Sequence, residues 1–155
     1  MSSPYDVTPA MLALAALMRA NLTPSPLNVV YDDIPVLFSD GAPFAFLEYK
    51  GGSNGPGDEY DNYGGSAHPT SQRVYTVEVI VAQALLSEVT TADQLTKAFV
   101  GTFYELIRQH ATLDGALGDH GEIIAIGDGL MPVQTSGTEV YLANTFTVQI
   151  SDFIS

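Results

Sequence analysis

Apolar residues recur along the chain with two different periods, which predict two helices among several strands. The first helix is expected to begin at Thr8-Pro9, with the Thr8 hydroxyl as N-cap and proline at the first helical position. Pro24 and Pro26 should end it, because proline removes a donor and pushes its predecessor out of the helical region. Its core stripe repeats every three to four residues: Met11, Leu14, Ala15, Met18 and Leu22.

The opposite side of this first helix is apolar as well. Leu12, Ala16 and Leu17 lie there, and the first charged residue is Arg19. A helix that is apolar all round is buried on more than one side. We therefore predict Leu12, Ala16 and Leu17 as a candidate subunit interface, with burial under loops of the same chain as the alternative.

Strict alternation makes Arg73 to Leu86 the clearest predicted strand. Tyr75, Val77, Val79 and Val81 should share one face of it. A second helix is predicted from Thr91, with Gln94 completing a capping box. Its expected apolar stripe is Leu95, Ala98, Phe99, Phe103, Leu106 and Ile107, whereas Lys97, Glu105 and Arg108 should face solvent.

Shorter alternating segments complete the predicted sheet. Strands are expected near 28–32, 44–50, 122–128 and 139–152, with a connection containing Pro132 and Gly137 before the last. In that last strand, the inward side chains should be Val140, Leu142, Phe146, Val148 and Ile150, and the outward ones Tyr141, Thr145, Thr147, Gln149 and Ser151. Short turns favour antiparallel pairs, and helices covering one face suit one-sided alternation. The predicted fold class is α+β: a single domain over residues 1–155, with a four- or five-stranded, mainly antiparallel sheet and two helices packed on one face.

Residues 51–71 break this regular pattern. The segment GGSNGPGDEYDNYGGSAHPT is rich in glycine and has no aliphatic side chain larger than alanine. Such a segment cannot bury enough surface to offset its own ordering entropy, so it is predicted to be a long mobile loop. Tyrosine is common at protein interfaces. Tyr60, Asp61 and Tyr63 are therefore candidate residues of a partner-docking loop.

Charge narrows the classes of partner. The chain has 18 acidic and 5 basic residues, a net charge of −13, yet only 15% of its residues are charged. Gripping nucleic acid requires clustered Lys and Arg, so an acidic surface favours DNA passing nearby without being bound. The longest apolar run, from Ala10 to Met18, is about half the ~20 residues that a membrane-spanning helix needs. With no basic segment at its start, the chain is expected to be a soluble product made in the cytoplasm.

No pattern of catalytic or metal-binding residues stands out. His68, His110 and His120 lack metal-ligand spacing, and His110 is expected near a helix end. Gly127 and Gly129 are interpreted as a turn, and the acidic residues of 58–61 as a solvated charge run rather than a calcium site. Asp32 and Asp33 should point to opposite faces of a strand and not act together. Without cysteine, thiolate chemistry is excluded, and no cofactor, metal or catalytic residue is predicted.

The order of these segments resembles the tail-terminator, or tail-completion, proteins of long-tailed bacteriophages. The likeness rests on the apolar helix at 11–22, PFAFLEYK before the Gly-rich loop, RVYTVEVIVAQAL followed by TADQLTKAFVGTFYELIRQH, and the closing YLANTFTVQISDF. It spans nearly the whole chain, although no single motif is diagnostic.

This resemblance implies a non-enzymatic virion component. Such proteins are α+β subunits that form a hexameric ring on the head-proximal end of the tail tube, stop tube polymerisation and offer a surface for joining the head through neck proteins. Six copies would carry roughly −78 charges, six times −13, which would keep passing DNA from sticking. The alternatives are another neck, head-closure or tail-tube subunit, and, in a different class, a monomeric ligand-binding α+β domain.

Overall fold

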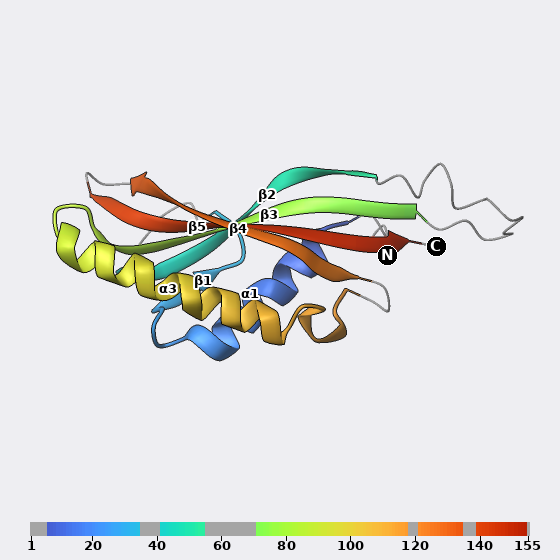
Figure 1. Cartoon of the computed structure of the whole chain (residues 1–155), viewed down its shortest axis with the longest axis horizontal. Coiled ribbons are helices and arrows are strands. Elements are labelled where there is room, and N and C mark those ends of the chain that lie inside the picture. Colours follow the sequence, from blue (N-terminus) through green and yellow to red (C-terminus); the bar gives the residue numbers. More distant parts are fainter. Residues whose placement is uncertain (1–5, 35–40, 55–70, 118–120, 135–138, 155) are drawn as a thin grey trace, which may run out of the picture.

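The described residues form a five-stranded sheet with two α-helices on one face. The computed structural model describes residues 6–34, 41–54, 71–117, 121–134 and 139–154. Its elements in chain order are α1 (Thr8–Leu22), β1 (Val29–Tyr31), β2 (Phe44–Asn54), β3 (Ser71–Leu85), α3 (Val89–Gln109), the short 3-10 helix η1 (Leu113–Gly115), β4 (Glu122–Gln134) and β5 (Val140–Ile154). Figure 1 shows both helices in one layer beneath the twisted sheet. The predicted α+β fold class is confirmed.

The strands lie in the order β1-β2-β3-β5-β4. Among the described strands, β1 and β2 pair in parallel, and the other pairs are antiparallel. The long strands β3 and β5 therefore form the centre, whereas β1 and β4 form the two edges. Because β1 has three residues and β4 has thirteen, the edge at β4 is much the longer of the two.

The main core lies between the helices and the central strands. Tyr75, Val77, Val79 and Val81 of β3 all face it, as their alternation predicted. From β5 come Phe146, Val148 and Ile150, also as predicted. The rings of Phe103 on α3 and Phe146 stack with their centroids 4.1 Å apart. Full burial of such side chains stabilises the fold by about 1.5–3 kcal/mol each, so this cluster fixes α3 on the sheet.

A second apolar cluster lies on the sheet face without helices. It contains Phe44, Phe46, Ile80, Ala82, Val133, Tyr141 and Ala143, all buried. The rings of Phe44 and Tyr141 meet edge to face with centroids 5.8 Å apart. Tyr141 thus faces away from the helices, as predicted, but both Tyr141 and Ser151, another residue of the predicted outward face, are buried. Twist brings side chains of separate strands together on this face, so alternation alone did not reveal their burial.

A buried polar link joins β3, β5 and α3. Gln83 lies at an irregularity in the register of β3 against β5, and its side-chain amide donates to the Asn144 side-chain carbonyl at 2.8 Å. Asn144 in turn donates to the backbone carbonyl of Thr96 on α3 at 3.0 Å. These bonds satisfy polar groups that would otherwise be costly to bury.

Both predicted helix caps are wrong in detail. Thr8 lies inside α1, and its N–H donates to a carboxylate oxygen of Asp6 at 3.0 Å. An acidic side chain therefore does what the Thr8 hydroxyl was expected to do. Helix α3 begins at Val89 and has no side-chain cap hydrogen bond, so the capping box of Thr91 and Gln94 does not form.

The buried face of α3 also differs from the predicted stripe. Leu95 and Ala98 are exposed, and Ala92 and Thr96 are buried in their place. The helix is turned so that Thr96 faces the sheet, where its carbonyl meets Asn144. The remaining predicted core residues of α3 and its predicted solvent-facing charges are confirmed.

Several strands extend further than their patterns predicted. Gly127 and Gly129, interpreted as a turn, pair with Thr147 and Thr145 inside β4. Pro132 also lies in β4. An edge strand tolerates it because one side of the strand has no partner needing its N–H. The first residues of the loop predicted over 51–71 belong to β2, and its last residue belongs to β3. Residues 55–70 lie outside the described part.

Candidate assembly surfaces

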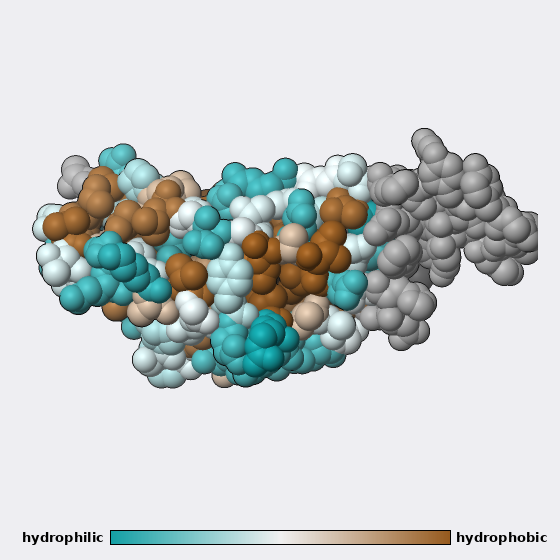
Figure 2. Space-filling view, viewed as in Figure 1, coloured by the Kyte–Doolittle hydropathy of each residue, from teal (hydrophilic) through white to brown (hydrophobic). Residues whose placement is uncertain are grey.

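An apolar groove runs between α3 and the edge strand β4. Its volume is about 470 Å³, and the residues that carry its shape are Gly101, Tyr104, Ile107, Ile123, Ile124 and Ile126. These six define what is called here the α3–β4 groove. Figure 2 shows hydrophobic side chains gathered on the face of the molecule where α3 meets β4. Ile124 is 47% exposed, so the groove presents apolar surface to solvent.

The groove is open because β4 is an edge strand and pairs with one strand, β5. Among the described residues, a few of α3 approach β4 besides its partner β5, and most side chains of β4 are exposed or half-buried. Proteins usually protect such an edge with lysine, proline or a β-bulge. Strand β4 contains neither lysine nor arginine, while Pro132 and the irregularity between Ile123 and Ala125 interrupt its free edge. Association with another chain would therefore use the exposed apolar side chains of β4 rather than its backbone.

Polar groups around the groove are bonded to one another. The Tyr104 hydroxyl donates to a carboxylate oxygen of Asp128 at 2.8 Å. Burial, and then this bond to an anion, raise the pKa of Tyr104. At the rim, Arg108 donates from Nε to Glu105 at 3.0 Å, and the bonds from Arg108 and Gln109 lower the pKa of Glu105. Small-ligand sites usually offer polar groups that converge on a ligand. The polar groups here are occupied by each other instead.

Gly101 leaves part of the groove without a side chain. It lies in the middle of α3, where glycine costs about 1 kcal/mol relative to alanine. A Cβ atom added at this position would meet no atom within 4 Å. Nothing in the described fold therefore requires glycine at 101, and the exposed helix backbone is accessible to atoms of another molecule.

A second exposed apolar surface runs along α1. Pro9, Leu12, Ala16 and Ala20 are exposed and fall on one helical stripe, defined here as the α1 ridge. Leu12 is 47% exposed. Two of the predicted interface residues, Leu12 and Ala16, are thus on the surface of the subunit. The structure corrects the third, because Leu17 is only 8% exposed and belongs to the core cluster.

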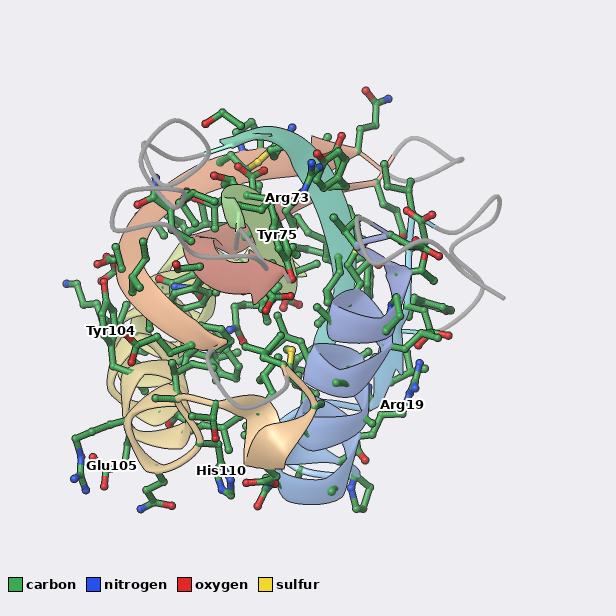
Figure 3. All side chains as sticks on the ribbon, turned by 90° about the vertical axis from the view of Figure 1, so that its right-hand side faces the viewer. Arg19, Arg73, Tyr75, Tyr104, Glu105 and His110 are labelled. Atoms are coloured by element: carbon green, nitrogen blue, oxygen red, sulfur yellow. The ribbon has the colours of Figure 1, made fainter. Side chains whose placement is uncertain are left out.

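Arg19 follows the α1 ridge on the same stripe. Its guanidinium donates to the backbone carbonyl of Val30 at 3.0 Å from Nε, and it pairs with Asp32. These contacts hold a cation beside the ridge. Figure 3 places Arg19 and Tyr104 on opposite sides of the molecule, so the ridge and the groove belong to opposite edges of the helix layer.

The other sequence candidates give little chemistry. Tyr60, Asp61 and Tyr63 of the predicted docking loop lie outside the described residues, as do His68 and His120. His110 caps the end of α3, where Nδ1 lies 2.7 Å from a carboxylate oxygen of Asp114. Asp32 pairs with Arg19, while Asp33 accepts from the N–H of Ile34 at 2.8 Å, so the two carboxylates do not act as a pair. Within the described ranges, no cluster of three or more His, Asp or Glu is arranged to hold a metal.

Sequence reasoning missed the α3–β4 groove. Two signals could have indicated it: a glycine inside an amphipathic helix, and the continuous run Ile123-Ile124-Ala125-Ile126 in a strand where alternation was expected. An unbroken apolar run predicts burial on both faces. On an edge strand, one of those faces stays open.

The chain matches no model of a known protein family, and no curated protein matches its sequence. Among the described helices, none is both long enough and apolar enough to cross a membrane.

Proposed function

We propose that this chain is a non-enzymatic, self-assembling virion subunit, a tail terminator that forms a ring at the head-proximal end of a phage tail tube. The observation that carries the proposal is the pair of apolar surfaces, the α1 ridge and the α3–β4 groove, that the described residues of one subunit leave uncovered. Monomeric proteins seldom expose such surfaces without a partner. The order of elements, which resembles that family over nearly the whole chain, gives the particular role.

The charge of the subunit supports this role. A net charge of −13 on each copy would make the wall of a central hole repel DNA and let it pass. The same negative charge makes copies repel one another and disfavours non-specific association. Assembly must therefore use surfaces that carry few charges. The ridge has this property, since none of its four residues is charged.

In this role the subunit would have partners on both faces of its ring. A tail-tube subunit would meet one face, and a neck or head-completion protein the other. Without a cofactor or a metal, the protein would act through shape and surface alone. A different neck, head-closure or tube subunit is the alternative within the same class.

A monomeric ligand-binding domain is the alternative from another class. The volume of about 470 Å³ favours it, because it falls within the range of small-molecule sites. The mutual bonding of Tyr104 with Asp128 and of Arg108 with Glu105 counts against it.

Light scattering and electron microscopy of the purified full-length chain test the proposal. A closed ring with a mass six times the 16.5 kDa of the chain is expected. Added to polymerising tube subunits of the same virus, the ring should limit tube length. Filaments of the chain alone would indicate a tube protein, and a particle that stays monomeric at high concentration would indicate the ligand-binding alternative.

A further inference from the structure

The α1 ridge and the α3–β4 groove are complementary in shape and polarity. The groove is concave and apolar, with Gly101 leaving the backbone of α3 bare at one wall. The ridge is convex: one leucine, Leu12, projects from a stripe of otherwise small residues. A leucine that projects between a proline and an alanine, Pro9 and Ala16, is the kind of surface that packs into such a groove.

Charged side chains beside both surfaces are paired within the subunit. Near the groove, Glu105 holds Arg108, and Asp128 accepts from Tyr104. Beside the ridge, Asp32 pairs with Arg19, the one basic residue of α1. The residues that define the ridge and the groove are themselves uncharged, so copies of a chain with a net charge of −13 meet least repulsion through them. Groove against groove would leave two hollows facing each other, whereas a ridge fills one.

We propose that the α3–β4 groove of one copy receives the α1 ridge of a second copy. The inference rests on the proposed function and names the surfaces through which that assembly is built. Because ridge and groove lie on opposite edges of the subunit, each copy uses two different surfaces and keeps one of each free. Such a heterologous contact continues from copy to copy and closes into a ring, or else runs on as a filament. It cannot end at a two-fold dimer.

Two variants test each surface separately. Leu12→Glu places a charge on the ridge at a position already 47% exposed, and Gly101→Phe fills the groove at a position where an added Cβ meets nothing. Each variant should fold as the wild type does and should stay monomeric at concentrations where the wild type assembles. Circular dichroism and thermal unfolding report the folding. Leu95→Glu is the matched control, because Leu95 is 36% exposed on α3 and does not line the groove, and it should assemble normally.

Mixing the two variants is the decisive measurement. The Leu12→Glu subunit keeps an intact groove, and the Gly101→Phe subunit keeps an intact ridge. An equal mixture should therefore give one-to-one dimers that grow no further, detected by sedimentation velocity or native mass measurement. Absence of dimers in the mixture would overturn the ridge-in-groove contact.

Two further outcomes separate this inference from the proposed function. If the wild type forms rings and both variants do so equally, the contact is wrong while the ring-forming role stands. If the wild type never assembles, the proposed function fails and this inference fails with it.

Discussion

Strands β3 and β4 are both rich in apolar residues, yet their surroundings are opposite. In β3, side chains on both faces are buried, Val77 and Val79 under the helices and Ile80 and Ala82 in the second cluster. In β4, Ile124 and Leu130 are 47% and 59% exposed, and Val133 is the one buried residue among its apolar side chains. The difference comes from position in the sheet. Hydrophobic residues in the central strand stabilise the subunit, whereas those at the edge stay on the surface, where the proposed assembly would use them.

Truncating the central core should have the largest effect on stability. Phe103→Ala removes a fully buried ring stacked on Phe146, so it should lower the free energy of unfolding by about 3–5 kcal/mol. Urea unfolding monitored by circular dichroism measures the loss. A loss below about 1 kcal/mol would show that α3 is not anchored through this ring.

Leu17 and Leu12 offer the same comparison within one helix. Leu17→Asp buries a carboxylate in the core and should cost several kcal/mol of stability, about 3 or more. An assembly defect in that variant would follow from unfolding. Leu12→Asp, on the exposed ridge, should change the free energy of unfolding by no more than about 0.5 kcal/mol. Equal losses in the two variants would contradict the different burial of the two leucines.

The polar link between β3, β5 and α3 should have an intermediate effect. Asn144→Ala leaves the Gln83 amide and the Thr96 carbonyl without their partner, which should cost about 1–3 kcal/mol. Exposed Asn21, whose side chain donates to Leu17 within α1, supplies a control, because Asn21→Ala should cost much less. Chemical denaturation of both variants gives the comparison.

Alkaline pH should weaken the subunit through Tyr75. Burial is the main cause that raises the pKa of this tyrosine to about 12, above its ordinary value near 10. A raised pKa means that the folded state favours the protonated phenol. The stabilisation that the protonated phenol gives the folded state is therefore complete below pH 10 and is lost between pH 10 and 12. At pH 11 the free energy of unfolding should be lower by about 1 kcal/mol for this reason. Tyr75→Phe should flatten this part of the stability profile, and an unchanged profile would contradict it.

Edge substitutions should have the smallest effect on the isolated subunit. Leu130→Ser on β4 should leave the free energy of unfolding within about 0.5 kcal/mol, because the side chain is 59% exposed. Thermal unfolding at low concentration checks this. A large loss would mean that β4 is part of the core in the same sense as β3.

The fold was predictable where one residue pattern has one structural explanation. Alternation placed Tyr75 to Val81 on the helix-covered face, and the three-to-four spacing placed Met11, Leu14 and Met18 in the core. Prediction was weaker at Gly127 and Pro132, because such residues favour turns locally but are tolerated in an edge strand. Of the two candidate assembly surfaces, the α1 ridge was predicted in part and the α3–β4 groove was not predicted. Composition revealed the apolar surplus of α1, but it did not distinguish buried Leu17 from exposed Leu12.

The sequence by itself determined the α+β class, the two helices and the identity of the main core residues, because periodicity reports which side chains share a face of an element. Only the tertiary structure decided what each remaining face meets. Strand order put the run from Ile123 to Ile126 at an edge, and sheet twist closed Phe44 and Tyr141 into a second cluster. Exposure depends on neighbours that are distant in sequence, so a local pattern cannot specify it.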